Sequence, residues 1–239
     1  MCRILVGSAL VGILLGASLP VQAGVFNSEK VNLADNATIQ IQADFDYSQI
    51  DSSYQHQTKF TDRDVYLGFI LGRNREEFEN HVRRGIEVFR EQYEVLPDSL
   101  PLTFDFDTEQ EQFAGKWDWA IPGRITFGLF QIQGWHNYNI EALVIHELTH
   151  REQELRGVFP TIVRYHTLLR EGKTEAESKE ILNQEEGLLA QYDLEMQKRE
   201  QQPVANEIDF YESLLKEEHL SSQGRGCILF MLQDAKLRQ

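Results

Sequence analysis

Alternation of apolar and polar residues predicts several short strands in the first half of the chain. Positions 38–45 and 102–106 alternate in the manner of strands with one buried face. A more continuous apolar run at 64–71 predicts a second, more buried strand. The strongest strand pattern covers 124–132. These segments predict a small sheet in the N-terminal half of the chain.

Helical signals surround and follow these strands. Asn74 with Glu77 three residues later is typical of a helix start, and that helix should end before Pro97. Its apolar face would consist of Phe78, Val82, Ile86 and Phe89. Further helices are expected at 139–157, 160–172, 174–200 with an interruption at Gly187, and 206–215. The order of elements predicts an α+β fold, with a small sheet followed by a helical C-terminal half.

The first residues read as a secretory signal peptide. Arg3 precedes an apolar stretch at 4–19, and small side chains near Ala23 predict cleavage before Gly24. The alternative is an uncleaved membrane anchor, but the stretch is short for a bilayer span and is interrupted by Pro20. We therefore expect a signal peptide at 1–23 and one domain at 24–239. The mature protein would be secreted or periplasmic, without stable membrane insertion.

Composition narrows the possible partners. The chain has 239 residues, enough for one domain, and a formal net charge of −15. Such a charge repels nucleic acid and anionic membranes, so neither is an expected partner. Cys227 is the only cysteine outside the predicted signal, which excludes an internal disulfide.

The most informative motif is His146-Glu147-Leu148-Thr149-His150, which reads H-E-x-x-H. On a helix the two histidines, four residues apart, lie on one face and can bind one metal ion. Glu147 would lie beside that ion, where its carboxylate can accept a proton from metal-bound water. The alternative is an ordinary helix with two surface histidines. The motif predicts a hydrolytic metal site with Glu147 as general base.

A catalytic zinc site needs a third protein ligand. The metzincin pattern requires glycine and histidine at positions that Gln153 and Arg156 occupy here, which excludes that class. A glutamate from a later helix is the other common solution. The segment Gln184-Glu185-Glu186-Gly187-Leu188-Leu189-Ala190 offers two.

This segment resembles the third-ligand motif of gluzincin peptidases, in which the glutamate before glycine binds zinc. The Asn-Glu-Gly-Phe-Ala segment of the aminopeptidase N type is one form. The segment is also similar to the Glu-Gly-Leu-Ala signature of a group that includes microtubule tyrosine carboxypeptidases. The resemblance covers 145–151 and 184–190 only. The second group has a histidine spacing one residue longer, and the aminopeptidase type is larger and has a shorter gap to its glutamate. The resemblance implies a zincin-like fold and a zinc-dependent peptidase.

The two glutamates give a conflict between periodicity and motif. Helical periodicity places Glu185 near the centre of an apolar stripe and Glu186 on its flank. The motif favours Glu186, which we take as the third zinc ligand with His146 and His150. The alternative is that both are solvated surface residues. Asp193, two turns after Glu186, is a candidate for orienting a ligand histidine.

Together these features predict an exported zinc metallopeptidase that hydrolyses a peptide or protein substrate. Zn²⁺ suits nitrogen and carboxylate ligands with one open position. The 124–132 strand could be a sheet edge that pairs with an extended peptide. Endo- or exopeptidase action and the oligomeric state stay open. The principal alternative is a non-catalytic exported binding or assembly protein on a zincin-like scaffold, and a third is metal-free helical packing.

Overall fold

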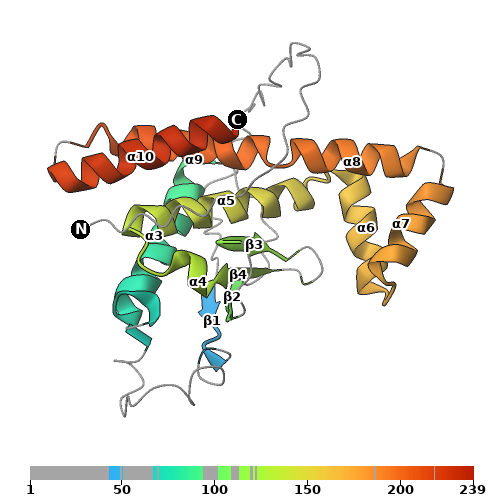
Figure 1. Cartoon of the computed structure of the whole chain (residues 1–239), viewed down its shortest axis with the longest axis horizontal. Helices are drawn as coiled ribbons and strands as arrows, with labels where there is room; N and C mark the ends of the chain where they lie inside the picture. Colours follow the sequence, from blue (N-terminus) through green and yellow to red (C-terminus); the bar gives the residue numbers. More distant parts are fainter. Residues whose placement is uncertain are drawn as a thin grey trace, which may run out of the picture. The chain divides into compact units, whose positions relative to one another are not determined.

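The structure is a computed structural model. It describes residues 43–48, 50, 67–68, 70–93, 102–108, 113–118, 121, 123–185, 187–217 and 219–239. The predicted signal peptide at 1–23 lies outside these residues. The described residues belong to one compact unit, Gln40–Gln239, and this unit has the α+β fold that the sequence predicts (Figure 1). Within the described part of the chain, no helix combines the length and apolar character needed to span a bilayer.

The sheet is small and mixed. Its strands are β1 (Ala43–Phe45), β2 (Leu102–Asp107), β3 (Gly115–Trp117) and β4 (Arg124–Gly128), in the order β1-β2-β4-β3. The pairs β1–β2 and β2–β4 are parallel, whereas β3 and β4 are antiparallel. The predicted strand at 102–106 is confirmed, and β1 forms the described end of the predicted strand at 38–45. β4 is paired on both sides, so the expectation that it forms a sheet edge is wrong; β3 occupies that end.

Two predicted strands are wrong wholly or in part. The described residues of the 64–71 segment are helical, and Leu67, Ile70 and Leu71 are all buried. Their i, i+3, i+4 spacing suits one face of a helix. A short apolar run is compatible with a buried strand as well as with a buried helix, so the sequence pattern did not distinguish the two.

The second error concerns the end of the 124–132 segment. The strand stops at Gly128, and α4 (Leu129–Ile132) follows. Leu129 and Ile132, three residues apart, turn into the core while Phe130 is 39% exposed. Helical spacing therefore replaces alternation after Gly128.

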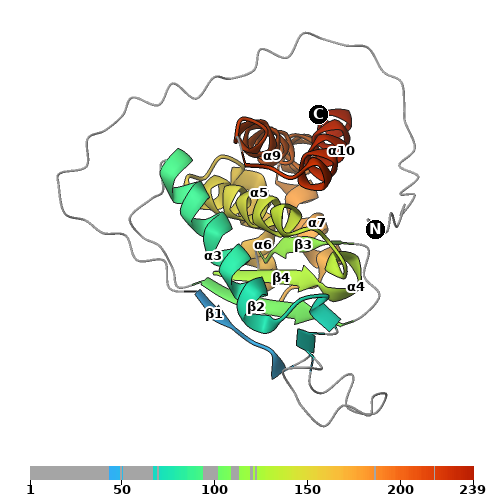
Figure 2. The same cartoon turned by 90° about the vertical axis from the view of Figure 1, so that its left-hand side faces the viewer.

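Helices make up most of the described unit. Besides α4 they are α3 (Arg75–Gln92), α5 (Asn137–Leu155), α6 (Pro160–Arg170), α7 (Glu175–Gln184), α8 (Leu188–Lys198), α9 (Gln201–Leu214) and α10 (Ser222–Arg238). Figure 2 shows α5 lying between the strands and the pair α9 and α10. Because α5 has neighbours on both sides, almost all of its second half is buried. This central helix carries the H-E-x-x-H motif.

The predicted helix caps are confirmed. The Asn74 side chain accepts a hydrogen bond from the Glu77 amide at 2.7 Å and starts α3. Thr174 and Glu177 form the reciprocal capping box that starts α7. Pro160 is the first residue of α6. These signals are local, since the cap and the backbone groups that it satisfies lie within one turn of helix.

The interruption expected at Gly187 is confirmed: the 174–200 segment is two helices, because Gly187 adopts a positive φ of 78° between α7 and α8. The helix expected from Asn206 begins earlier, at Gln201, with Pro203 in its first turn, where proline is tolerated. Glu200 consequently lies at the junction between α8 and α9.

Close packing of α3 on α5 leaves no room for a side chain at Gly85. A Cβ there would lie 2.9 Å from the Glu141 carbonyl oxygen and 2.9 Å from the Val144 Cβ. We expect Gly85→Ala to lower the free energy of unfolding by about 1–3 kcal/mol through overpacking. Gly226→Ala on α10 is the matched control, since nothing lies within 4 Å of its Cβ position. Helix propensity should make that variant more stable, by up to about 1 kcal/mol. Urea denaturation distinguishes the two, and stabilisation by Gly85→Ala would contradict the packing.

Candidate metal centre

The two histidines and the glutamate of the motif lie on the buried part of α5. His146 is 8% exposed, Glu147 3% and His150 5%. The apolar stripe of the same helix, Ile140, Val144 and Leu148, is fully buried in the core. The motif side chains extend from other faces of the same helix. The alternative of two surface histidines on an ordinary helix is therefore wrong.

Glu200 completes a group of three possible metal ligands. One ligand atom from each of His146, His150 and Glu200 lies within 4.8 Å of the other two. Among the described residues, this is the one group of three such side chains that could hold a metal ion. Glu200 Oε2 lies 3.1 Å from His146 Nε2 and 3.4 Å from His150 Nε2. The side chain of Glu200 is 42% exposed, whereas the imidazoles are buried. The group is thus open to solvent on the Glu200 side.

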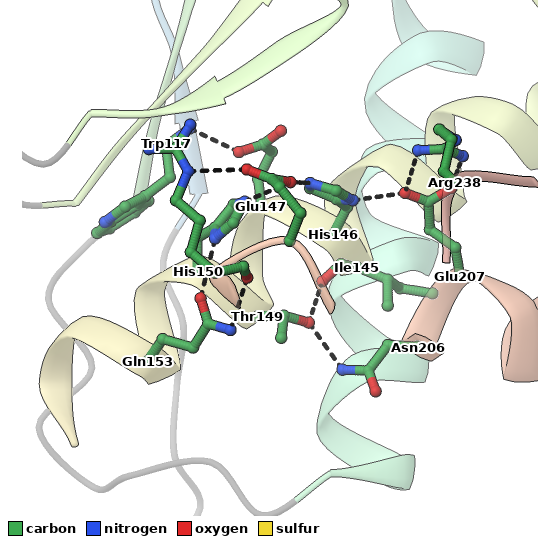
Figure 3. A network of polar contacts seen from close by, with 12 residues as sticks. Trp117, Ile145, His146, Glu147, Thr149, His150, Gln153, Asn206, Glu207 and Arg238 are labelled. Atoms are coloured by element: carbon green, nitrogen blue, oxygen red, sulfur yellow. Dashed lines mark hydrogen bonds and ion pairs between the residues drawn. The ribbon is translucent and has the colours of Figure 1, made fainter. Parts of the chain in front are cut away.

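The second ring nitrogen of each histidine has its own acceptor. His146 Nδ1 lies 2.5 Å from Glu207 Oε1, and His150 Nδ1 lies 3.0 Å from Gln153 Oε1 (Figure 3). A carboxylate or amide oxygen can only accept, so Nδ1 carries the proton in both rings. The Nε2 atom of each ring faces Glu200. Without a metal ion, His146 carries a proton on Nε2 as well and donates it to Glu200, in line with its raised pKa. A metal ion would replace that proton, and Nδ1–H with Nε2 on the metal is the arrangement that metal-binding histidines with such partners adopt.

Hydrogen bonds hold α9 and the α8–α9 junction against α5. Asn206 Nδ2 donates to Thr149 Oγ1 at 2.8 Å, and Thr149 Oγ1 donates to the Ile145 carbonyl. Gln153 Nε2 donates to the Arg199 carbonyl at 3.0 Å, one residue before Glu200. Figure 3 shows the contacts from Asn206 through Thr149 to Ile145 close to the two histidines. They fix the backbone on both sides of Glu200 relative to the motif helix.

The group stabilises positive charge at its centre. Burial by itself would lower the pKa of His146, but the carboxylates of Glu200 and Glu207 raise it to about 10. Burial would raise the pKa of Glu200, but hydrogen bonds to His146 and His150 hold it well below its usual range. Both shifts have one physical cause, which is a cluster of acceptors that favours a cation between them. A divalent metal ion satisfies the same requirement.

Glu147 is held by the neighbouring strand. Its Oε2 accepts a hydrogen bond from the Trp117 backbone amide at 2.6 Å. The Trp117 ring is fixed in turn, because its Nε1 donates to Glu154 Oε2 at 2.8 Å. β3 approaches α5 closely, and a Cβ on Gly115 would lie 2.7 Å from Leu143 and 3.1 Å from Glu147 Oε1. The carboxylate of Glu147 is thereby fixed in orientation beside His146.

The predicted ligand Glu186 lies outside the described residues. Its neighbour Glu185 is placed, and its carboxylate lies 3.3 Å from Arg164 of α6 rather than in the histidine group. The periodicity argument for Glu185 carried one helical phase across the expected interruption at Gly187, and that step is wrong because α7 ends at Gln184 and α8 begins anew at Leu188. Asp193 is exposed on α8, so the orienting role suggested for it falls to Glu207 and Gln153.

Sequence reasoning did not single out Glu200 or Glu207, although a signal was present. Val204, Ile208 and Tyr211 form the buried stripe of α9. Glu207 lies three residues after Val204 and four before Tyr211, so it is a carboxylate within an apolar stripe. Glu200 lies two turns before Glu207 on the same face. Acidic residues in such positions are buried only when a partner compensates them.

No protein-family model, curated protein or solved structure matches this chain. The functional proposal is therefore built on the residues of the site. Two imidazoles, a carboxylate open to solvent and an adjacent buried carboxylate can bind a divalent cation and accept a proton next to it.

Proposed function

We propose that this protein is an exported zinc-dependent metallopeptidase. The observation that carries the proposal is the convergence of His146, His150 and Glu200, with Glu147 fixed beside them. The third ligand in this proposal is Glu200 of the α8–α9 junction. The sequence motif had favoured Glu186, and the two assignments make different predictions for single substitutions.

The donor set fits zinc. Two imidazole nitrogens and one carboxylate oxygen are the ligands of a common class of catalytic zinc sites, which keep a fourth position for water. When bound, the ion would lower the pKa of a coordinated water toward about 7 and polarise a substrate carbonyl. Both Nδ1 atoms are already bonded to Glu207 and Gln153, so both Nε2 atoms are available as ligands. The Glu200 side chain is 42% exposed, so water reaches the group from that side.

Glu147 has the position that a general base requires. It lies one residue after His146 on the same helix, so its carboxylate is beside the ligand group rather than part of it. In the proposed reaction it accepts a proton from the attacking water and delivers it to the leaving amine. The Trp117 amide keeps the carboxylate oriented without adding a charge. That arrangement leaves Oε1 of Glu147 as the atom that takes the proton.

The substrate would lie along β3. Ala114 and Asp118 direct backbone groups to β4, since Gly128 N donates to Ala114 O and Asp118 N donates to Arg124 O. Backbone groups alternate along a strand, so those of Gly115 and Trp117 point to the other edge. The Trp117 amide on that edge contacts Glu147. Since that amide is already bonded to Glu147, an extended peptide would pair with the remaining backbone groups of the edge, and its backbone would then lie next to the general base.

A non-catalytic binding or assembly protein is the second candidate. The observation in its favour is the hydrogen bond between Glu147 and the Trp117 amide, because that bond alone gives the carboxylate a structural role in joining β3 to α5. In this case the histidine group would bind metal without turnover.

Metal removal tests the proposal. Protein purified without chelator should contain one zinc per chain and cleave members of a broad peptide library. Treatment with a chelator should abolish cleavage, and added Zn²⁺ should restore it. Bound zinc with no cleavage of any peptide would favour the second candidate. Activity that survives complete metal removal would contradict both metal-dependent proposals.

A further inference from the structure

Arg238 of α10 is connected to the metal centre through one intervening residue. Its Nη2 donates to Glu207 Oε2 at 2.6 Å, and its Nη1 donates to Glu207 Oε1 at 3.3 Å. Glu207 Oε1 is the same atom that accepts the His146 Nδ1 proton. Figure 3 shows the line of contacts from Arg238 through Glu207 to His146. Three helices, α10, α9 and α5, are joined by it.

The geometry of this contact gives Arg238 control over the orientation of Glu207. A guanidinium that donates to both oxygens of a carboxylate fixes the plane of that carboxylate. Glu207 is only 6% exposed, so water does not replace a lost partner easily. Asp234, one turn earlier on α10, lies 3.3 Å from Arg238 Nε and holds the guanidinium in turn. The carboxylate that orients His146 is itself held in place.

We propose that Arg238 is a positioning residue of the metal centre. Through Glu207 it holds the His146 ring with Nε2 directed at the ligand group, and it thereby increases the affinity for zinc. This inference rests on the proposed metal site, and it adds a residue from an element that carries no ligand.

The competing explanation is that Arg238 only joins α10 to α9. Lys236 provides the matched control, because its Nζ lies 2.7 Å from Glu212 Oε1 and connects the same two helices. The side chains of Lys236 and Glu212 are 50% and 45% exposed. Among the described residues, the hydrogen bonds of the Glu207 carboxylate go to His146 and Arg238, and none goes to Lys236 or Glu212. A purely structural effect of Arg238 should therefore be shared by Lys236.

A double-mutant cycle on zinc affinity tests the inference. The zinc dissociation constant would be measured by competition with a chromophoric chelator for wild type, Arg238→Gln, Glu207→Gln, the double variant and Lys236→Gln. Glu207→Gln should weaken binding by roughly 10- to 100-fold, the usual effect of losing a histidine partner. Arg238→Gln, one contact further away, should weaken it by about 3- to 10-fold. When Glu207 is already replaced by glutamine, Arg238→Gln should not weaken zinc binding further, because Arg238 contacts His146 only through the Glu207 carboxylate.

The outcomes separate the inference from the proposed function. Wild-type zinc affinity in Arg238→Gln, or the same loss in Lys236→Gln or in the Glu207→Gln background, overturns the role of Arg238 alone. Absence of zinc binding by the wild type overturns the metal site and the inference with it. Arg238→Lys keeps the charge without the two-donor geometry and should give an intermediate affinity. Its circular dichroism and melting temperature show whether a loss of affinity comes from unfolding.

Discussion

Replacement of Glu147 by glutamine is expected to lower kcat for peptide hydrolysis by about 100- to 10,000-fold, the usual contribution of a general base. Glutamine has nearly the same shape, and its amide oxygen can still accept the Trp117 N–H. It cannot take a proton from water. Because His146, His150 and Glu200 are untouched, zinc content should stay at one per chain. Turnover of a peptide substrate and metal analysis on the same sample measure both effects.

Glu87→Gln is the matched control for this variant. Glu87 is exposed on α3, and the same change of charge and shape there should leave turnover and zinc content at wild-type values. Activity of Glu147→Gln close to that of the control would remove Glu147 from the mechanism. Loss of zinc together with activity would instead identify Glu147 as part of the metal-holding structure rather than as the general base.

Replacement of Glu200 by glutamine is expected to weaken zinc binding by more than about 100-fold. A residue that touches a ligand histidine typically costs 10- to 100-fold, and a direct ligand should cost more. His150→Gln should have an effect of the same order. The glutamine amide oxygen can still accept from the buried imidazoles, so the replacement leaves no buried group without a partner that would unfold the protein. Isothermal titration with zinc, alongside thermal denaturation of the metal-free protein, measures affinity and folding separately.

Glu185→Gln and Glu186→Gln are the matched controls, since the same chemical change is made at the two positions that the sequence motif favours. Glu185 is paired with Arg164, so its loss should leave zinc affinity unchanged. If Glu186→Gln abolishes zinc binding and Glu200→Gln does not, the gluzincin-like assignment of the third ligand is right and the one proposed from the geometry is wrong.

Local signals explain which parts of the fold could be predicted from the sequence. The starts of α3 and α7 depend on the side chain of the first residue and a backbone amide three residues later, so Asn74 and Thr174 were informative by themselves. The H-E-x-x-H spacing is equally local, because one helix places both histidines. The apolar run at 64–71 had no such marker, and its described residues are helical.

The third ligand could not be predicted in the same way, because it depends on how distant helices pack. Glu200 approaches the histidines because the helix from Thr174 is interrupted at Gly187 and α9 then docks on α5 through Asn206 and Glu207. The number of residues between Glu200 and the motif does not predict how these helices pack. The apolar stripe of α9, with Glu207 inside it, is the one local pattern that indicated a buried acidic residue facing another element.

The most direct test of the metal centre is a crystal structure of the zinc-loaded protein with anomalous data at the zinc edge. We expect one strong anomalous peak, at about 2.0–2.1 Å from the Nε2 atoms of His146 and His150 and about 2.0–2.2 Å from a Glu200 oxygen. Glu147 should lie beside the peak without binding it. A peak bound by other residues, or a zinc-soaked crystal with no peak between the two histidines, would contradict the proposed site.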